Sequence, residues 1–68
     1  MRVLINGRPQ ELDAGATVES IVAALPDAPQ GRGVAVALDG EVIPRGQWRS
    51  TSLDEGARIE VVVAVQGG

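Results

Sequence analysis

The 68-residue sequence contains no cysteine, no histidine and, since all six of its positive side chains are arginine, no lysine. These absences exclude a thiol nucleophile, an imidazole base, a Schiff-base amine, a disulfide and a zinc site built from Cys or His. Ordinary proton transfer would have to rely on Asp, Glu, Ser, Thr and Arg alone. We therefore expect a protein that is not an enzyme and has no metal or cofactor, and that enters chemistry, if at all, as a substrate.

The charge balance and the apolar runs exclude two classes of partner. Nine carboxylates against six arginines give a net charge of −3, the wrong sign for binding nucleic acid by release of its counterions. The longest apolar runs, Val61–Val65 among them, are far too short for a membrane span or for the core of a signal peptide. We expect a cytoplasmic protein with neither a nucleic-acid nor a membrane partner.

The length of the chain and its turn signals predict one small domain that contains two β-hairpins. A chain of 68 residues, 44% of them hydrophobic, is apolar enough to fold but can build only one core. Asn6-Gly7 and Asp39-Gly40 tolerate the positive φ of tight hairpin turns, so each is expected to join two antiparallel strands. From Ile59 onward, apolar residues alternate and predict a last strand with one face in the core. We expect a single domain over residues 1–68 with a flexible tail at residues 66–68.

A single helix is predicted between the two hairpins. Thr17 is placed to cap its free N–H groups, and Pro26 disfavours its continuation beyond Leu25, which gives about eight residues. The apolar face of this helix is formed by Val18, Ile21, Val22 and Leu25. Because one short helix covers only one face of a sheet, the expected fold is α+β with two layers, a helix grasped by a sheet of four to five strands.

Strand alternation divides the apolar residues between the two faces of this sheet. Those expected to face the helix and form the core are Val3, Ile5, Leu12, Ile21, Val22, Leu25, Val36, Leu38, Ile59, Val61 and Val63. Leu4, Val62 and Ala64 then point to the opposite face. An apolar patch left open to water there predicts a docking surface for a partner.

The only aromatic residue, Trp48, lies in the polar and irregular segment 44–52, between Arg45 and Arg49. Tryptophan and arginine are favoured anchors at interfaces. We nevertheless interpret Trp48 as closing one end of the small core, with the two arginine side chains in solvent.

The chain ends in Gln66, Gly67 and Gly68 directly after the predicted last strand. A terminal glycine pair is compatible with a frayed tail, because termini are often mobile. It is equally what a narrow enzyme tunnel requires, since residues without Cβ allow close approach of the backbone. If a partner adenylated the terminal carboxylate, a sulfur nucleophile would displace AMP and leave a thiocarboxylate on Gly68. Gly67 and Gln66 would then give the reacting group its access.

The sequence resembles the ThiS family of sulfur carrier proteins over essentially its whole length. The features that carry the resemblance are Asn6-Gly7, Ala14-Gly15-Ala16-Thr17-Val18, Val36-Ala37-Leu38-Asp39-Gly40-Glu41, Val42-Ile43-Pro44-Arg45 with Trp48, and then Leu53, Gly56, Ile59-Glu60 and Gly67-Gly68. One departure is Ala57, where the family often has an acidic residue after the glycine, and this puts a turn interaction in doubt. The resemblance implies a mixed-sheet β-grasp, or ubiquitin-like, fold.

The resemblance also implies partners and a role in thiamine biosynthesis. An E1-like adenylyltransferase would activate Gly68 with ATP, a cysteine desulfurase relay would supply the sulfur, and thiazole synthase would receive it. Three alternatives stay open at this point: a sulfur carrier for another pathway of the molybdopterin type, a ubiquitin-like protein modifier, and an interaction module whose tail is incidental.

Overall fold

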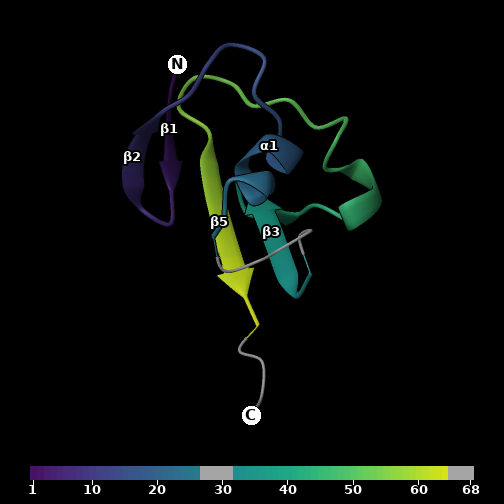
Figure 1. Cartoon of the computed structure of the whole chain (residues 1–68). Coiled ribbons are helices and arrows are strands. Elements are labelled where there is room, and N and C mark those ends of the chain that lie inside the picture. The colour runs from purple at the N-terminus through teal and green to yellow at the C-terminus, as the bar shows by residue number, and fades with distance from the viewer. Residues whose placement is uncertain (27–31, 65–68) are drawn as a thin grey trace.

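A computed structural model describes residues 1–26 and 32–64 as a five-stranded sheet with one helix packed against it (Figure 1). The strands are β1 (Arg2–Ile5), β2 (Arg8–Glu11), β3 (Val34–Leu38), β4 (Glu41–Val42) and β5 (Arg58–Val63), and the helix α1 is Val18–Ala23. Their order across the sheet is β2-β1-β5-β3-β4, with β1 parallel to β5 and every other pair antiparallel. The expected α+β, two-layer fold with a mixed sheet is confirmed.

Both hairpins form where the sequence predicts them. Asn6 and Gly7 have φ values of 52° and 81°, and Asp39 and Gly40 have 50° and 86°. Positive φ at both central residues is the property of a two-residue turn whose twist matches that of the flanking strands. These turns fix the register, so that Ile5 pairs with Arg8 and Leu38 pairs with Glu41.

The helix begins at the predicted cap and ends earlier than predicted. The Thr17 hydroxyl accepts a hydrogen bond from the Ser20 N–H at 3.2 Å, and the Ser20 hydroxyl oxygen accepts one from the Thr17 N–H at 3.0 Å, forming a capping box. At the other end the N–H groups of Ala24 and Leu25 bond to carbonyls only three residues back. The last turn is thus tightened ahead of Pro26, and α1 has six residues rather than about eight.

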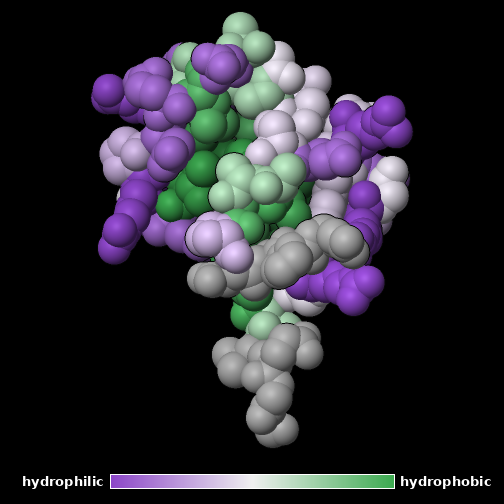
Figure 2. All heavy atoms as spheres, viewed as in Figure 1, coloured by the Kyte–Doolittle hydropathy of each residue, from purple (hydrophilic) through white to green (hydrophobic). Residues whose placement is uncertain are grey.

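Alternation along the strands correctly placed the centre of the core. Val3, Val36, Ile59 and Val61 are buried between the sheet and α1, together with Ile21 and Val22. The other residues predicted for the core are only half-buried and pack around its margin: Ile5, Leu12, Leu25, Leu38 and Val63. Figure 2 shows apolar residues gathered in the middle of this side of the molecule, between polar residues of β2 and of the segment after β4.

Four further residues complete the core, although the list of core residues predicted from strand and helix alternation does not include them. They are Val18, Trp48, Leu53 and Ala57. Trp48 follows a single 3₁₀ turn (Arg45–Gln47) in the segment expected to be irregular, and its indole N–H donates to the Ile43 carbonyl at 2.9 Å. With 6% of its surface exposed, Trp48 closes one end of the core, as predicted. Leu53 is held in place by its N–H bond to the Ala16 carbonyl.

The departure at Ala57 does not disrupt its turn. The Ala57 N–H donates to the Asp54 carbonyl at 3.0 Å, and the Gly56 N–H donates to the Arg2 carbonyl at 2.7 Å. The turn is therefore closed by backbone bonds without an acidic side chain at position 57. The small Ala57 side chain is buried in the core.

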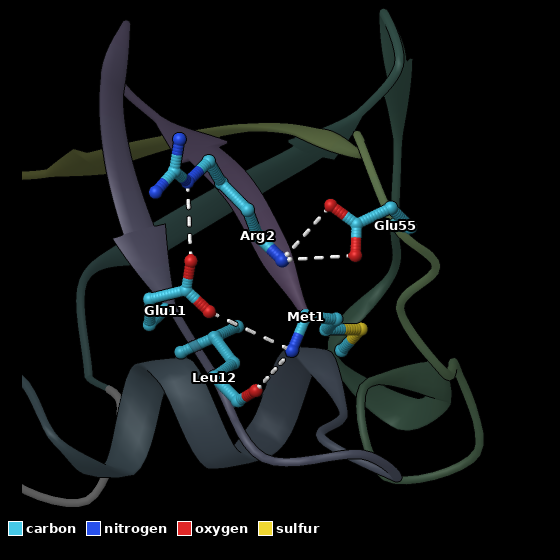
Figure 3. A network of polar contacts seen from close by, with 5 residues as sticks. All are labelled: Met1, Arg2, Glu11, Leu12 and Glu55. Atoms are coloured by element: carbon cyan, nitrogen blue, oxygen red, sulfur yellow. Dashed lines mark hydrogen bonds and ion pairs between the residues drawn. The ribbon is translucent and has the colours of Figure 1, made fainter.

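A polar network ties together the beginning of β1, the end of β2 and the turn before β5 (Figure 3). The amino terminus donates to the Leu12 carbonyl at 2.8 Å and lies 3.8 Å from a Glu11 carboxylate oxygen. The Arg2 N–H bonds to both carboxylate oxygens of Glu55, at 3.1 and 3.2 Å. Because β1 and β5 are parallel, this network lies at the end of the sheet where β5 begins. The other end, where β5 leads to the terminal residues, has no ion pair among the described residues.

Candidate functional site

The candidate site is the carboxyl end of β5, the strand at the centre of the sheet order. β5 is paired with β3 over all but its first residue, from Ile59 opposite Leu38 to Val63 opposite Val34. One further backbone bond, from the Ala64 N–H to the Gly33 carbonyl at 2.7 Å, follows the last strand residue. The predicted tail residues Gln66, Gly67 and Gly68 lie outside the described part of the chain. The structure establishes how β5, the strand that leads to these residues, is held in the sheet.

On its other side, β5 is held by the side chain of Asn6 rather than by a further residue of β1. The Asn6 amide nitrogen donates to the Val61 carbonyl at 3.1 Å, and the Asn6 side-chain oxygen accepts from the Val61 N–H at 2.8 Å. The Asn6 N–H also donates to the Ile59 carbonyl at 2.8 Å. A turn residue therefore takes the place of a strand partner and fixes β5 two residues before it ends.

The three predicted docking residues share the face of the sheet opposite α1, but they differ in exposure and position. Val62 is 65% exposed, Ala64 is exposed, and Leu4 is half-buried. Leu4 stands opposite Arg58 in the ladder. Val62 lies four residues farther along β5, about 13 Å away. The charged residues Arg58 and Glu60 occupy the same face between them.

The apolar neighbours of Val62 come from β3 and β4 instead. Ala35 pairs with Val62, Ala37 pairs with Glu60, and Val42 pairs with Ala37. Val42 is 72% exposed. Sequence reasoning missed Val42, although its signal was available, since Val42 alternates with Ile43, which packs against the core. The outer face thus presents two exposed apolar side chains, Val62 on β5 and Val42 on β4. The strand between them, β3, contributes two alanines to this face.

Leu4 lines a separate hollow of about 710 Å³ between the two hairpin turns. Its other walls are formed by Asn6, Gly7, Asp39, Gly40, Arg58, Ile59 and Glu60. One Asp39 carboxylate oxygen accepts the Arg58 N–H at 2.9 Å, so this carboxylate closes the turn onto β5. No group of three or more His, Cys, Asp or Glu side chains suited to a metal occurs within residues 1–26 and 32–64.

Arg45 and Arg49 lie on the helix side of the molecule, away from the outer face. They line a pocket of about 450 Å³ with Glu19, Val22, Ala23, Gly46 and Trp48. The Arg45 guanidinium carbon lies 5.7 Å from the centre of the Trp48 ring, within the range of a cation–π contact. In the part of the chain that the structure describes, no helix is long and apolar enough to cross a membrane.

These features define the class of protein. A mixed sheet of five strands around one short helix, with β1 and β5 parallel at its centre, is a β-grasp, or ubiquitin-like, fold. The chain matches the model of the ThiS family over residues 3–68, and it belongs to that family.

Two kinds of known protein resemble the chain. The first matches it end to end. The chain is 31% identical to the sulfur carrier protein ThiS of Escherichia coli over 68 residues, 100% of both chains. A crystal structure of a thiamine biosynthesis protein (ThiS) from Geobacter metallireducens matches with a TM-score of 0.80 and 31% identity, again over 100% of both chains.

The second kind consists of longer proteins. The chain is 37% identical over 68 residues to a thiazole synthase of Magnetococcus marinus and 29% identical over 68 residues to a thiazole synthase of Paramagnetospirillum magneticum. In both cases all of this chain is matched but only 20% of the relative. The chain therefore spans about a fifth of the length of these two relatives.

Proposed function

We propose that this chain is a sulfur carrier of thiamine biosynthesis, a carrier rather than a catalyst, and that Gly68 bears the sulfur. The observation that supports this most strongly is the match to the ThiS family over residues 3–68, a range that includes the terminal glycine pair. The end-to-end likeness to a protein named as a sulfur carrier supports it further. On this proposal residues 1–68 act as one carrier domain, and residues 66–68 are the segment that enters a partner's active site.

The chemistry requires only the terminal carboxylate and two partners. A Gly68 carboxylate oxygen attacks the α-phosphorus of ATP and releases pyrophosphate, which gives an acyl adenylate. A sulfide-level sulfur nucleophile then attacks the carbonyl carbon and displaces AMP, leaving a thiocarboxylate. The first step requires an E1-like adenylyltransferase. The second requires sulfide, or the persulfide of a cysteine desulfurase relay together with a thiol reductant, which cleaves the resulting acyl disulfide and leaves the thiocarboxylate. Both chemical steps occur at the end of the backbone, which suits a chain without cysteine.

Thiazole synthase is the acceptor that we propose. Two relatives that carry this name contain a segment matching the whole of this chain. A carrier and an acceptor that occur in one polypeptide elsewhere are expected to meet when they are separate chains. Gln66 and Gly67 would then carry the Gly68 thiocarboxylate into the acceptor without the obstruction of bulky side chains.

We also propose that the outer face of the sheet docks the activating enzyme. Val62 and Ala64 are exposed on this face shortly before the terminal residues, so a partner that binds Gly68 would lie close to both. Leu4 contributes through the separate hollow between the hairpin turns. The small residues beside Val62 leave its side chain accessible, which suits insertion into an apolar pocket of the partner.

The test is intact-mass spectrometry of the chain after incubation with an E1-like adenylyltransferase of the thiamine pathway, ATP and a sulfide source. The expected product differs from the parent by replacement of one oxygen with sulfur, and a chain lacking Gly68 should not form it. Deletion of Gly68 moves the carboxylate back by about 3.5 Å, more than the alignment of reacting groups tolerates. A ladder of heavier conjugates from cells would instead indicate a protein modifier, and an unchanged mass would refute the carrier function. A thiocarboxylate that forms but is not consumed by thiazole synthase would indicate a carrier for another pathway.

A further inference from the structure

The hydrogen-bond pattern of β5 leaves one backbone edge open close to the candidate site. Successive residues of a strand direct their N–H and C=O groups to opposite sides. In β5 the even-numbered residues bond to β3, as the bond from Asp39 to the Arg58 carbonyl and the bond from Ala64 to the Gly33 carbonyl show. The odd-numbered residues bond toward β1: the carbonyls of Ala57 and Ile59 accept from Leu4 and Asn6.

This alternation directs the N–H and C=O of Val63 toward the β1 side of the sheet. β1 does not extend that far. Its register with β5 ends where Ile5 pairs with Ile59, and the Asn6 side chain satisfies Val61. The chain then turns back at Gly7 into β2. Among residues 1–26 and 32–64, no hydrogen-bond partner for the Val63 N–H or C=O is found.

The outer edge of β2 is blocked to a partner strand. A strand of a partner is therefore directed to the open backbone groups of Val63. By the same alternation, Pro9 and Glu11 face outward from β2, since Leu12 bonds inward to the Met1 carbonyl. Pro9 has no N–H to offer a neighbouring strand, and a proline or a charged residue on an edge strand prevents unwanted pairing. The fold thus blocks an outer edge while leaving an inner one open beside the terminal residues.

From this geometry we propose that an extended segment of the activating enzyme pairs with β5 at Val63, adding a strand in the place that β1 leaves empty. The inference rests on the proposed function and assigns it a mode of binding. Strand addition suits a partner that must hold the end of the chain straight, because main-chain bonds fix direction without requiring particular side chains. The adenylating partner must contact residues directly after Val63 in order to reach Gly68. That partner, rather than a second copy of this chain, is therefore the occupant we assign.

The test uses three versions of the full chain made by total synthesis: the parent, a chain with an N-methyl group on Val63, and a chain with an N-methyl group on Glu11. N-methylation removes a single N–H and keeps every side chain. The Glu11 version is the matched control, because its N–H also faces outward from a strand, at the blocked edge. Adenylation is measured as pyrophosphate release with the E1-like adenylyltransferase and ATP, folding as the thermal midpoint, and self-association by sedimentation.

We expect the Val63 version to lose about tenfold in kcat/KM, the equivalent of one interfacial hydrogen bond, with an unchanged thermal midpoint. The Glu11 version should match the parent in both. Equal kcat/KM for all three chains would overturn strand addition while leaving the carrier function intact, whereas a parent that is not adenylated at all would overturn the proposed function itself. A lower midpoint for the Val63 version would mean that its N–H is already bonded in the fold. A parent dimer that is lost on Val63 methylation would make a second copy the occupant, and would equally overturn the proposal.

Discussion

Asn6 offers the sharpest test of how the end of β5 is held. Its side chain makes two hydrogen bonds to Val61, at 2.8 and 3.1 Å. Its backbone φ is 52°, a positive value that most residues with a Cβ adopt only at a cost in free energy. Asn6→Gly removes the two bonds but adopts the same φ freely, whereas Asn6→Ala removes the bonds and also incurs the backbone strain. The two variants therefore separate the side-chain contribution from the conformational one.

The structure gives the size of each effect. At about 0.5–1.5 kcal/mol for each net hydrogen bond, Asn6→Gly should lower the free energy of unfolding by about 1–3 kcal/mol. Asn6→Ala should lower it by roughly 1–2 kcal/mol more, the cost of a left-handed conformation for a residue with a Cβ. A chain of 68 residues has a total stability of only about 3–10 kcal/mol, so both losses should be readily measured.

Urea denaturation followed by tryptophan fluorescence suits this comparison, because Trp48 is the only aromatic residue and is 6% exposed. Hydrogen exchange of the Val61 amide supplies a local measurement, and it should be faster in Asn6→Gly than in the parent. If Asn6→Gly unfolds within about 0.5 kcal/mol of the parent and the Val61 amide stays protected, the two bonds do not secure β5. β5 would then not be fixed close to Val63, and the open edge proposed there would lack a rigid support.

Five other substitutions test the remaining assignments. Val61→Ala should lower the free energy of unfolding by about 1–4 kcal/mol, whereas Val62→Ala one residue later should change it by less than about 0.5 kcal/mol; equal effects in urea titrations would contradict the assignment of faces. Val62→Asp should leave the melting midpoint unchanged but raise the KM of the chain for adenylation, and an unchanged KM would count against the docking face. Trp48→Phe leaves the Ile43 carbonyl without its donor and should lower the free energy of unfolding, measured by calorimetry, by about 1–3 kcal/mol. A thermal midpoint equal to that of the parent would show that the indole N–H bond does not stabilise the fold. Gly67→Val should fold normally yet slow adenylation, as intact mass would reveal, because a β-branched side chain cannot follow a glycine into a narrow tunnel.

The local features of the fold were determined by the sequence itself. The positive φ values at Asn6 and Asp39 follow from the residues of each turn, and the capping box joins Thr17 to Ser20, three positions later. The alternation around Val61 and Val62 correctly predicted which of the two is buried and which exposed. Such features follow from sterics and hydrogen bonds over a few neighbouring residues, so they can be read without knowing the rest of the fold.

Only the tertiary structure decided which segments meet. β1 pairs with β5 from the opposite end of the chain, and the contact of Asn6 with Val61 joins residues 55 positions apart in the sequence. No local rule acts over such a separation. Alternation predicts only that Leu4 and Val62 share a face, whereas the pairing of β1 with β5 places them apart on it. The same pairing ends before Val63, so the backbone edge of Val63 has no neighbouring strand on that side. Register between distant strands is fixed by how the whole core packs. The sequence therefore indicated which residue carries the proposed chemistry, while the fold decided how the strand that leads to it is held and which of its edges stays open.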